Sequence, residues 1–387
     1  MKTRSSVQSP SSSPSIIAYP SRVPLRVKRL GSGDREIAAV AWTDLDASGN
    51  VGSLTTSWAW TATWLDHYGP SVPHRFIIAE DTGNPVGAAL LASSGDRLRG
   101  RWLHLGTAGE DSAATVFVEH NTLHAVPGTE AAFADALVGE IRDLGGWDRI
   151  VLDGFRPDAA RVFAHAASGS WEPEPQGCPV TDLSAVRAAG GDVVSVLPSS
   201  RRSRARRSLR AFGDLQTEWC GDAASAREAL DELAELNRQR WAAVGQSTPF
   251  DDPRFVGFHR DLVARLAPAG NAWIFRVRDD EGTVCSLYCL RDGERVLFYQ
   301  SGLRMTEDNR LRPGLAGHVL SINACAERGF DVYDFLAPPS RYKQELATGQ
   351  EQLVWSAVER PTVLSSLRRA PRTRRAARRN GREDVTE

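Results

Sequence analysis

Two segments that lie far apart in the chain repeat the same order of features. The first begins "TVFVEHNTLHAVPGTEAAF" at residue 115, and the second begins "RVLFYQSGLRMTEDNRLRPGLAG" at residue 295. Each has a strand-like apolar run, an irregular stretch, a Pro-Gly pair, a helix-like stretch that ends at glycine, and another apolar run. Proline in the first turn and glycine just past the last turn are common signals of helix ends. The repeat therefore predicts a duplicated strand–loop–helix–strand unit.

Further strands precede this unit in both copies. The stretch "HRFIIAEDTGNPVGAALLAS" predicts a hairpin that turns at residues 81–84. The stretch "AWIFRVRDDEGTVCSLYCLRDGERVLFYQSG" predicts three strands with turns at 279–282 and 292–293. A strand that follows a helix also implies a right-handed crossover in a largely parallel sheet. The fold class that follows is α/β, in two tandem domains.

Length and local composition divide the chain into four parts. A chain of 387 residues suits two domains of ordinary size. The two ends are poor in apolar residues, and such segments cannot offset their ordering entropy by burial, so we expect both to be disordered. The predicted parts are a Ser/Pro-rich tail (1–22), a first domain (23–190), a second domain (191–360) and a basic tail (361–387).

Overall composition excludes several classes of protein. Hydrophobic residues make up 41% of the chain and the net charge is −1, which suits a globular protein without a general attraction to nucleic acid. No apolar run is long enough to span a membrane, and the start lacks the apolar core of a secretory signal. Five cysteines without ligand spacing predict no metal site and suit a reducing cytoplasm.

Lysine is almost absent from the chain, which has 44 arginines and only three lysines. Lys343 is the one lysine far from the N-terminus, and it follows Tyr342 in "RYKQEL". A lysine ammonium is a compact charge whose pKa can move, whereas a guanidinium is a fixed planar fork. Lys343 is therefore either a functional residue or an accident of codon usage. Alternation in "DVYDFL" places the Asp334 carboxylate on an apolar strand face, as either a general base or a structural salt bridge.

Several motifs together resemble the GNAT acyltransferase fold. They are "SWAWTATWLDHYG", "LNRQRWAAVG", "YQSGL", "RPGLAG" and "RGFDVYDFLAPPSRYKQELA", and the tandem order is similar to the FemAB-like branch with its CelD-type members. The resemblance covers about residues 25–360 and implies a twisted mixed sheet flanked by helices in each domain. The chain lacks both the Gly-x-Gly-x-x-Gly dinucleotide motif and a Walker loop.

The resemblance implies a site in the second domain. The helix start in "RLRPGLAG" would hold the pyrophosphate of acyl-CoA, although Pro313 removes one N–H donor and an ordinary helix start is the alternative. Lys343 would stabilise the oxyanion, with Tyr299 near the acyl group unless it simply packs in the core. The donor-binding residues implied are Arg312, Gly314, Leu315, Ala316, Gly317 and Ser301; the catalytic ones are Lys343, Asp334, Tyr342 and Tyr299.

Acceptor-binding residues are predicted on two helices. Asn237 interrupts the apolar face of a helix over 222–243, so it points either to a cleft or into a hydrogen-bonded core. Arg240 and Trp241 follow on the same helix, and Trp58 begins a tryptophan-rich helix near the start. Trp60 and Trp64, spaced by four residues, are predicted to pack in the core of the first domain.

Two arginine runs leave the donor open. Residues 201–210 hold six arginines and residues 368–382 hold eight; each is a solvated face or a binding surface for phosphates of CoA or tRNA. Three hypotheses follow: an N-acyltransferase that uses acyl-CoA and an amine of a small molecule or cell-envelope precursor, a FemAB-type transferase that uses aminoacyl-tRNA, and a non-enzymatic nucleic-acid-associated protein. Acceptor, acyl group and oligomeric state are not indicated.

Overall fold

The computed structural model describes residues 24–360 except 50, 97–99, 111–114 and 169, so both predicted tails lie outside the described residues. The first half carries eleven helices and strands: β1 (Arg26–Gly31), α1 (Arg35–Ala47), α2 (Trp58–His67), β2 (His74–Asp81), β3 (Asn84–Asp96), β4 (Gly100–Leu105), β5 (His124–Ala125), α3 (Glu130–Leu144), β6 (Arg149–Phe155), α4 (Pro157–Ala167) and β7 (Ser170–Asp182).

The second half repeats this order after three additional helices. It contains α5 (Leu183–Ala188), α6 (Val193–Val196), α7 (Ser199–Phe212), β8 (Gln216–Cys220), α8 (Ala223–Ala243), α9 (Pro253–Leu266), β9 (Ala272–Asp279), β10 (Gly282–Asp292), β11 (Arg295–Leu303), α10 (Pro313–Glu327), β12 (Val332–Asp334), α11 (Arg341–Leu346) and β13 (Gly349–Glu359). Short 3-10 helices lie at Ser32–Asp34, Leu54–Thr56, Pro249–Asp251 and Ala267–Ala269.

The predicted strands and helices of both copies are present. The hairpin β2–β3 turns at residues 82–83, and β9, β10 and β11 follow one another as predicted. Helix α3 follows the first Pro-Gly pair, α10 begins with the second, and α8 covers the predicted helix. The expectation of a largely parallel sheet was wrong, because among the described strands only β4–β6 and β11–β12 pair in parallel. The sheet is mixed, with antiparallel hairpins dominating each half.

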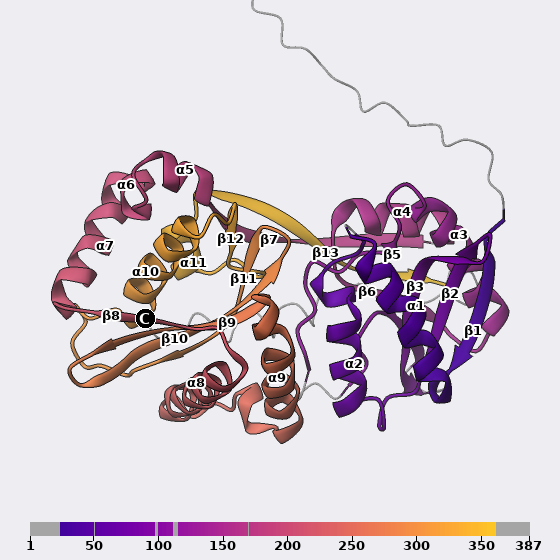
Figure 1. Ribbon diagram of the computed structural model, residues 1–387, viewed down its shortest axis with the longest axis horizontal. Coiled ribbons are helices and arrows are strands. Elements are labelled where there is room, and N and C mark those ends of the chain that lie inside the picture. The colour runs from indigo at the N-terminus through magenta and orange to yellow at the C-terminus, as the bar shows by residue number, and fades with distance from the viewer. Residues whose placement is uncertain (1–23, 50, 97–99, 111–114, 169, 361–387) are drawn as a thin grey trace, which may run out of the picture.

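The two halves exchange their last strands and so share one sheet. The strand order is β1-β2-β3-β4-β6-β13-β7-β12-β11-β10-β9-β8, with β5 beside β3. Strand β13, from the end of the second half, lies between β6 and β7 of the first half. Strand β7, from the end of the first half, reaches β12 of the second half. Figure 1 shows both long strands passing between the two lobes. The boundary at residue 190 stays a prediction.

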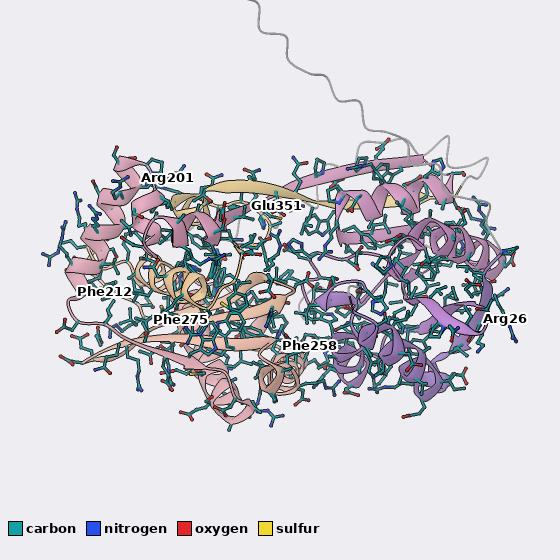
Figure 2. All side chains as sticks on the ribbon, turned by 45° about the horizontal axis from the view of Figure 1, so that its top comes forward. Arg26, Arg201, Phe212, Phe258, Phe275 and Glu351 are labelled. Carbon is teal, nitrogen blue, oxygen red and sulfur yellow. The ribbon has the colours of Figure 1, made fainter. Side chains whose placement is uncertain are left out.

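Helices α2 and α9 bring the two halves together on one face of this sheet. One core cluster contains residues of both halves, including Trp60, Phe258 and Leu297. The Trp60 ring lies 5.3 Å from Phe258 and 6.4 Å from Tyr299, measured between ring centroids. Figure 2 shows Phe258 where the two lobes meet. Trp60 and Trp64 are fully buried, as expected, but Trp60 packs against the second half as well as the first.

His259 of α9 gives the shared core a dependence on pH. The side chain is fully buried among aromatic rings, and neither ring nitrogen has a hydrogen-bond partner among the described residues. Burial lowers the pKa of His259 to about 3, and the charge of His67 lowers it further. In the unfolded chain a histidine has a pKa of about 6.5, so the unfolded state binds a proton at pH values at which the folded state does not. The free energy of unfolding therefore falls as the pH falls from about 6.5 to about 3.

We therefore expect His259→Leu to weaken this loss of stability in acid. Between about pH 7 and about pH 5 the wild type should lose about 2 kcal/mol more unfolding free energy than the variant does. Urea unfolding of both proteins at the two pH values measures the difference. An equal loss in the two proteins would show that His259 already carries a proton in the folded state.

Candidate active site

The candidate site lies where β11 and β12 diverge. The two strands pair in parallel only from Arg295–Val332 to Leu297–Asp334. Beyond this point β11 continues to Leu303, while β12 ends and the backbone turns at Leu336 in a left-handed conformation (φ 60°). The edge of β11 that faces β12 is therefore left without a strand partner among the described residues. Such an edge offers backbone N–H groups to a bound acyl oxygen.

Asp334 ends β12 and is completely buried. Its Oδ2 atom accepts from Nε2 of His120 and from Nη1 of Arg295, both at 2.8 Å, and its Oδ1 atom accepts from the backbone N–H of Leu336 at 2.7 Å. Burial alone would raise the pKa of Asp334, but the hydrogen bond and charge of His120 and the charge of Arg295 hold that pKa below its usual range. The ion pair with Arg295 supports the structural alternative for this carboxylate.

Lys343 lies in α11, and its ammonium group faces the segment that follows β12. The side chain is buried, and Nζ donates to the carbonyl oxygens of Leu336 at 3.3 Å and Pro338 at 3.1 Å. These contacts hold the turn at the point of strand divergence. The ammonium thus places a buried positive charge against the segment that leaves the end of β12.

The two predicted tyrosines lie on opposite sides of the sheet. Tyr299 packs against the rings of Trp60 and His259, and its hydroxyl oxygen accepts from the backbone N–H of Phe117 at 3.0 Å. Burial raises the pKa of Tyr299 well above its ordinary value, so its hydroxyl stays neutral. Tyr342 stacks on His318 of α10, with ring centroids 5.9 Å apart. Packing thus accounts for the position of both rings.

The start of α10 is covered by a buried carboxylate. Glu345 of α11 accepts from Nη1 of Arg312 at 2.8 Å and lies 3.5 Å from Nη1 of Arg204. Gly314, Leu315 and Ala316 form the buried first turn of α10. Gly317 packs so closely on β10 that an added Cβ would overlap Sγ of Cys285, so this glycine is required by helix–strand packing. Glu345 is a residue that the sequence did not single out.

At the equivalent helix start in the first half, a glutamate of the helix itself accepts a nearby backbone hydrogen bond. Glu130 begins α3, and its Oε2 atom accepts from the backbone N–H of Gly128 at 2.8 Å. A carboxylate at this position disfavours a second anion. The two helix starts therefore differ: α3 is capped by an adjacent glutamate, whereas α10 meets an arginine–glutamate pair from outside the helix.

Asn237 of α8 lies against the end of β11. Its Nδ2 atom donates to the carbonyl oxygen of Ser301 at 2.8 Å, and its Oδ1 atom accepts from the hydroxyl of Thr248 at 2.6 Å. Both groups of the amide are thus bonded within the protein. Trp241 is half-buried further along α8, and Arg240 is half-buried beside it. Trp58, in the first half, contacts Trp42 and is partly buried against the core cluster that both halves share.

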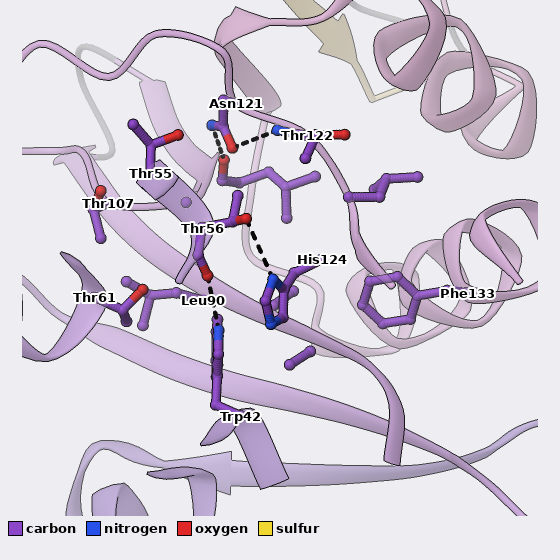
Figure 3. A pocket seen from close by; sticks show the side chains of 15 residues that line it. Trp42, Thr55, Thr56, Thr61, Leu90, Thr107, Asn121, Thr122, His124 and Phe133 are labelled. Atoms are coloured by element: carbon purple, nitrogen blue, oxygen red, sulfur yellow. Dashed lines mark hydrogen bonds between the residues drawn. The ribbon is translucent and has the colours of Figure 1, made fainter. Parts of the chain in front are cut away.

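A small cavity lies inside the first half, between α1, β3 and the loop before α3 (Figure 3). It has a volume of about 20 Å³, and its polar lining includes Thr56, Asn121 and His124. Nδ1 of His124 lies 3.3 Å from the Thr56 hydroxyl, and the imidazole stacks on Trp42. This volume suits about one water molecule rather than an acyl donor.

Helix α7 contains the first arginine run, and its arginines divide into two sets. Arg202 donates to the carbonyl oxygens of Ser195 and Leu197, and Arg201 donates to that of Ala347, so these two stabilise the fold. The exposed set is Arg206, Arg207 and Arg210.

Residues 116–123, here called the crossing segment, extend from the first half over the divergence of β11 and β12. Within it, Oε2 of Glu119 accepts from the backbone N–H of Ala337 at 2.7 Å, and His120 contacts Asp334. Both side chains are buried. Sequence reasoning missed them because His120 and Asp334 are 214 residues apart. Their only sequence signal was the position of "VEHN" in the irregular stretch of the first repeat.

The described residues offer neither a metal site nor a membrane-spanning helix. They contain no group of three or more His, Cys, Asp or Glu side chains placed to hold a metal ion. No helix within residues 24–360 combines the length and the apolar character needed to cross a bilayer.

Part of the second half is similar to a known family. Residues 199–344, from the start of α7 into α11, match the model of a family described as an acetyltransferase (GNAT) domain. Among solved structures, FemX is similar over 86% of this chain and 96% of its own, with 12% identity and a TM-score of 0.56. L-PGS from Bacillus licheniformis is similar over 85% of this chain and 93% of its own, with 12% identity and a TM-score of 0.53.

The similarity to these two structures concerns the fold. At 12% identity they show the fold alone, but they extend over both halves of the chain. A sequence search of curated proteins found no match. The predicted GNAT resemblance and mixed α/β fold are confirmed, and the family match supports an acyltransferase without fixing its donor.

Proposed function

We propose that the chain is an N-acyltransferase that moves an acyl group from acyl-CoA to an amine of a small molecule or cell-envelope precursor. The observation that carries this proposal is the divergence of β11 and β12 inside the matched GNAT domain, with a buried lysine beside it. Proteins of one fold can catalyse different reactions, so the support for the proposal is the strand divergence and its lysine rather than the fold alone.

The donor binds at the start of α10. The backbone N–H groups of Gly314 and Leu315 point out of the first helical turn, and the partial positive charge of the helix end favours the pyrophosphate. Arg312 leaves Glu345 and pairs with the incoming phosphate. Ala316 and Gly317 allow close packing of the helix on β10, and Ser301 lies beside the acyl chain.

The reaction joins the two substrates directly, and groups of the protein assist it. The amine nitrogen attacks the carbonyl carbon, the C–S bond of the thioester breaks, and the sulfur leaves with the electron pair and takes a proton. Lys343 and the backbone N–H groups of β11 stabilise the negative oxygen that forms in between. Asn237, Arg240, Trp241 and Trp58 remain the proposed acceptor-binding residues, of which Asn237 acts by fixing the end of β11.

A second candidate keeps the reaction but uses aminoacyl-tRNA as donor. It is favoured by the exposed arginines of α7, Arg206, Arg207 and Arg210, which lie on the helix that also contributes Arg204 near the start of α10. A non-enzymatic nucleic-acid-binding role uses the same arginines but gives no reason for a buried lysine at the strand divergence.

Transfer itself is the test of the proposal. The full chain is incubated with acetyl-CoA, with a long-chain acyl-CoA or with charged tRNA, each with a set of primary amines, and the products are identified by mass spectrometry. We expect an N-acylated amine from an acyl-CoA. Product formed only from charged tRNA would replace the first candidate by the second, and no product from any donor would reject both.

Salt dependence distinguishes the two donors independently of the acceptor. We expect the triple variant Arg206→Gln, Arg207→Gln, Arg210→Gln to bind acyl-CoA about as well as the wild type, with a shallow fall of affinity in salt. Affinity for tRNA should fall steeply with salt. The fall should be less steep in the variant, because a protein that contacts fewer phosphates releases fewer counterions on binding. Titrations at several salt concentrations measure both slopes. Indifference of both donors to salt and variant would assign these arginines to solvated surface.

A further inference from the structure

His120 and Asp334 form a buried pair across the two halves. His120 Nε2 lies 2.8 Å from Asp334 Oδ2, and the two residues are 4% and 0% exposed. His120 has a left-handed backbone (φ 56°), which is uncommon for a residue other than glycine. The backbone of the next residue, Asn121, is held by Gly154 and Arg156 through hydrogen bonds of 2.9 and 2.8 Å. The fold therefore keeps the imidazole in place despite an unfavourable backbone conformation.

The contacts of Asp334 determine which nitrogen of His120 carries the proton. The carboxylate accepts from Arg295 and from the backbone of Leu336 as well as from His120, and its pKa lies below the usual range. A charged carboxylate has only acceptors, so Nε2 must be the donor. Among the described residues, the hydrogen bond of the His120 ring is the one from Nε2 to Asp334, and Nδ1 takes no part in it. In the neutral ring Nδ1 therefore has a lone pair available to accept a proton.

The His120 imidazole lies beside the point at which β11 and β12 diverge. Asp334 is paired with Leu297, the last residue before β11 and β12 separate. Leu297 and Tyr299 face the core that includes α8 and α9, whereas Val296 and Phe298 face the core that includes α10. Because Asp334 contacts Arg295 on the first of these faces, His120 approaches the divergence from the side opposite α10. His120 and the start of α10 thus lie on opposite faces of the sheet.

We infer that His120 is the general base that takes a proton from the acceptor ammonium, and that Asp334 is a positioning residue that fixes its tautomer. This inference rests on the proposed acyl transfer. The ammonium gives one proton to Nδ1, and the neutral amine attacks the carbonyl carbon. As the C–S bond breaks, or the C–O bond of an aminoacyl ester, the nitrogen loses its second proton to the leaving atom. The proton on His120 passes to water.

Charged groups around the ring influence this proton transfer. They are Asp334 of β12, Arg295 of β11, Glu351 of β13, which accepts from Arg295 at 2.9 Å, and Glu119 in the crossing segment. His120 and Arg295 each lie 2.8 Å from the same oxygen of Asp334, so the arginine charge offsets part of the negative charge beside the imidazole.

A first experiment needs no substrate. Two-bond 1H–15N NMR spectra of the histidine rings in the full chain report which nitrogen is protonated, with the His120→Gln spectrum giving the assignment. We expect neutral His120 to carry its proton on Nε2. A proton on Nδ1 in the neutral ring would overturn the inference.

A second experiment separates proton removal from simple positioning. His120→Gln and its control His124→Gln, four residues further along the chain at the start of β5, are assayed with acetyl-CoA, a long-chain acyl-CoA or charged tRNA against primary amines and against hydroxylamine. Hydroxylamine is largely uncharged at neutral pH and needs no base. His120→Gln should lose about 10²–10⁴ in rate with primary amines, the range for general base catalysis, but little with hydroxylamine. His124→Gln should resemble the wild type with both, and melting temperatures verify folding.

The outcomes distinguish a failure of the role of His120 from a failure of the proposed acyl transfer. Equal losses of His120→Gln with both nucleophiles, or no loss with either, would overturn the role of His120 and leave acyl transfer in place. Absence of transfer by the wild type to either nucleophile from any of these donors would overturn the proposed function, and the role of His120 with it.

Discussion

A chain that ends at Thr348 is expected to lose cooperative folding in both halves. It lacks β13, which pairs with β7 along eleven register positions and also with β6 of the first half. Three buried side chains, Leu353, Val354 and Val358, are lost with it. Burial of such side chains contributes about 1.5–3 kcal/mol each, and the sum approaches the whole stability of about 5–15 kcal/mol of a typical domain.

The matched control for this truncation ends at Arg360 and lacks only the basic tail. We expect this control to melt cooperatively, close to the full chain, and to keep its transfer activity. Circular dichroism during heating compares the three proteins. A cooperative transition of the shorter chain near that of the control would contradict the exchange of strands between the halves.

Lys343→Met is expected to lower turnover by about 10²–10³, the scale for loss of one donor to an oxyanion. The change keeps the length of the side chain and removes the charge beside the divergence of β11 and β12. Donor affinity should change little, since the interaction strengthens mainly in the transition state. Lys343→Arg should also be impaired, because a planar guanidinium does not reproduce the compact charge that contacts the carbonyls of Leu336 and Pro338.

Those carbonyl contacts make a structural role the competing explanation. Melting temperature and donor affinity of Lys343→Met are therefore measured with turnover. If the lysine only holds the turn after β12, the variant should melt earlier and bind donor poorly, while the folded fraction turns over normally. If the two groups act as a unit, the double variant Asp334→Asn, Lys343→Met should lose less turnover than the product of the two single losses. Unchanged turnover in a stable Lys343→Met protein would make this lysine an accident of codon usage.

Local signals in the sequence predicted the helices and hairpins well. The turns at 81–84 and 292–293 and the helix start at Pro313 depend on residues close together in the chain, so glycine and proline positions were enough. The exchange of β7 and β13 was not predicted, because neither strand shows in its own residues which neighbour it will have. The pairing depends on contacts between distant parts of the chain.

The candidate site was predicted only in part for the same reason. Lys343 was singled out by its rarity and Asp334 by strand alternation, but their partners come from elsewhere. Asp334 pairs with His120 from the other half, and Arg312 pairs with Glu345. Gly317 was assigned to phosphate binding from its motif, although close packing against β10 explains it. A motif gives the residue type at a position but not the surface that the position faces.

Donor binding tests the central claim, that the second half holds the donor. Melting temperatures of the wild type, Gly314→Asp and Gly128→Asp are measured with acetyl-CoA, a long-chain acyl-CoA and charged tRNA. Gly314→Asp adds a carboxylate to the first turn of α10, where only the movable end of Leu303 is near. Gly128→Asp adds one before α3 at a positive φ of 88°, which strains the variant, so each protein is compared with itself in the presence and absence of donor. A donor at a hundredfold excess over its Kd should stabilise the wild type and Gly128→Asp by about 2.7 kcal/mol, and Gly314→Asp by far less. Stabilisation lost in Gly128→Asp but kept in Gly314→Asp, or absent from the wild type with every donor, would contradict the account.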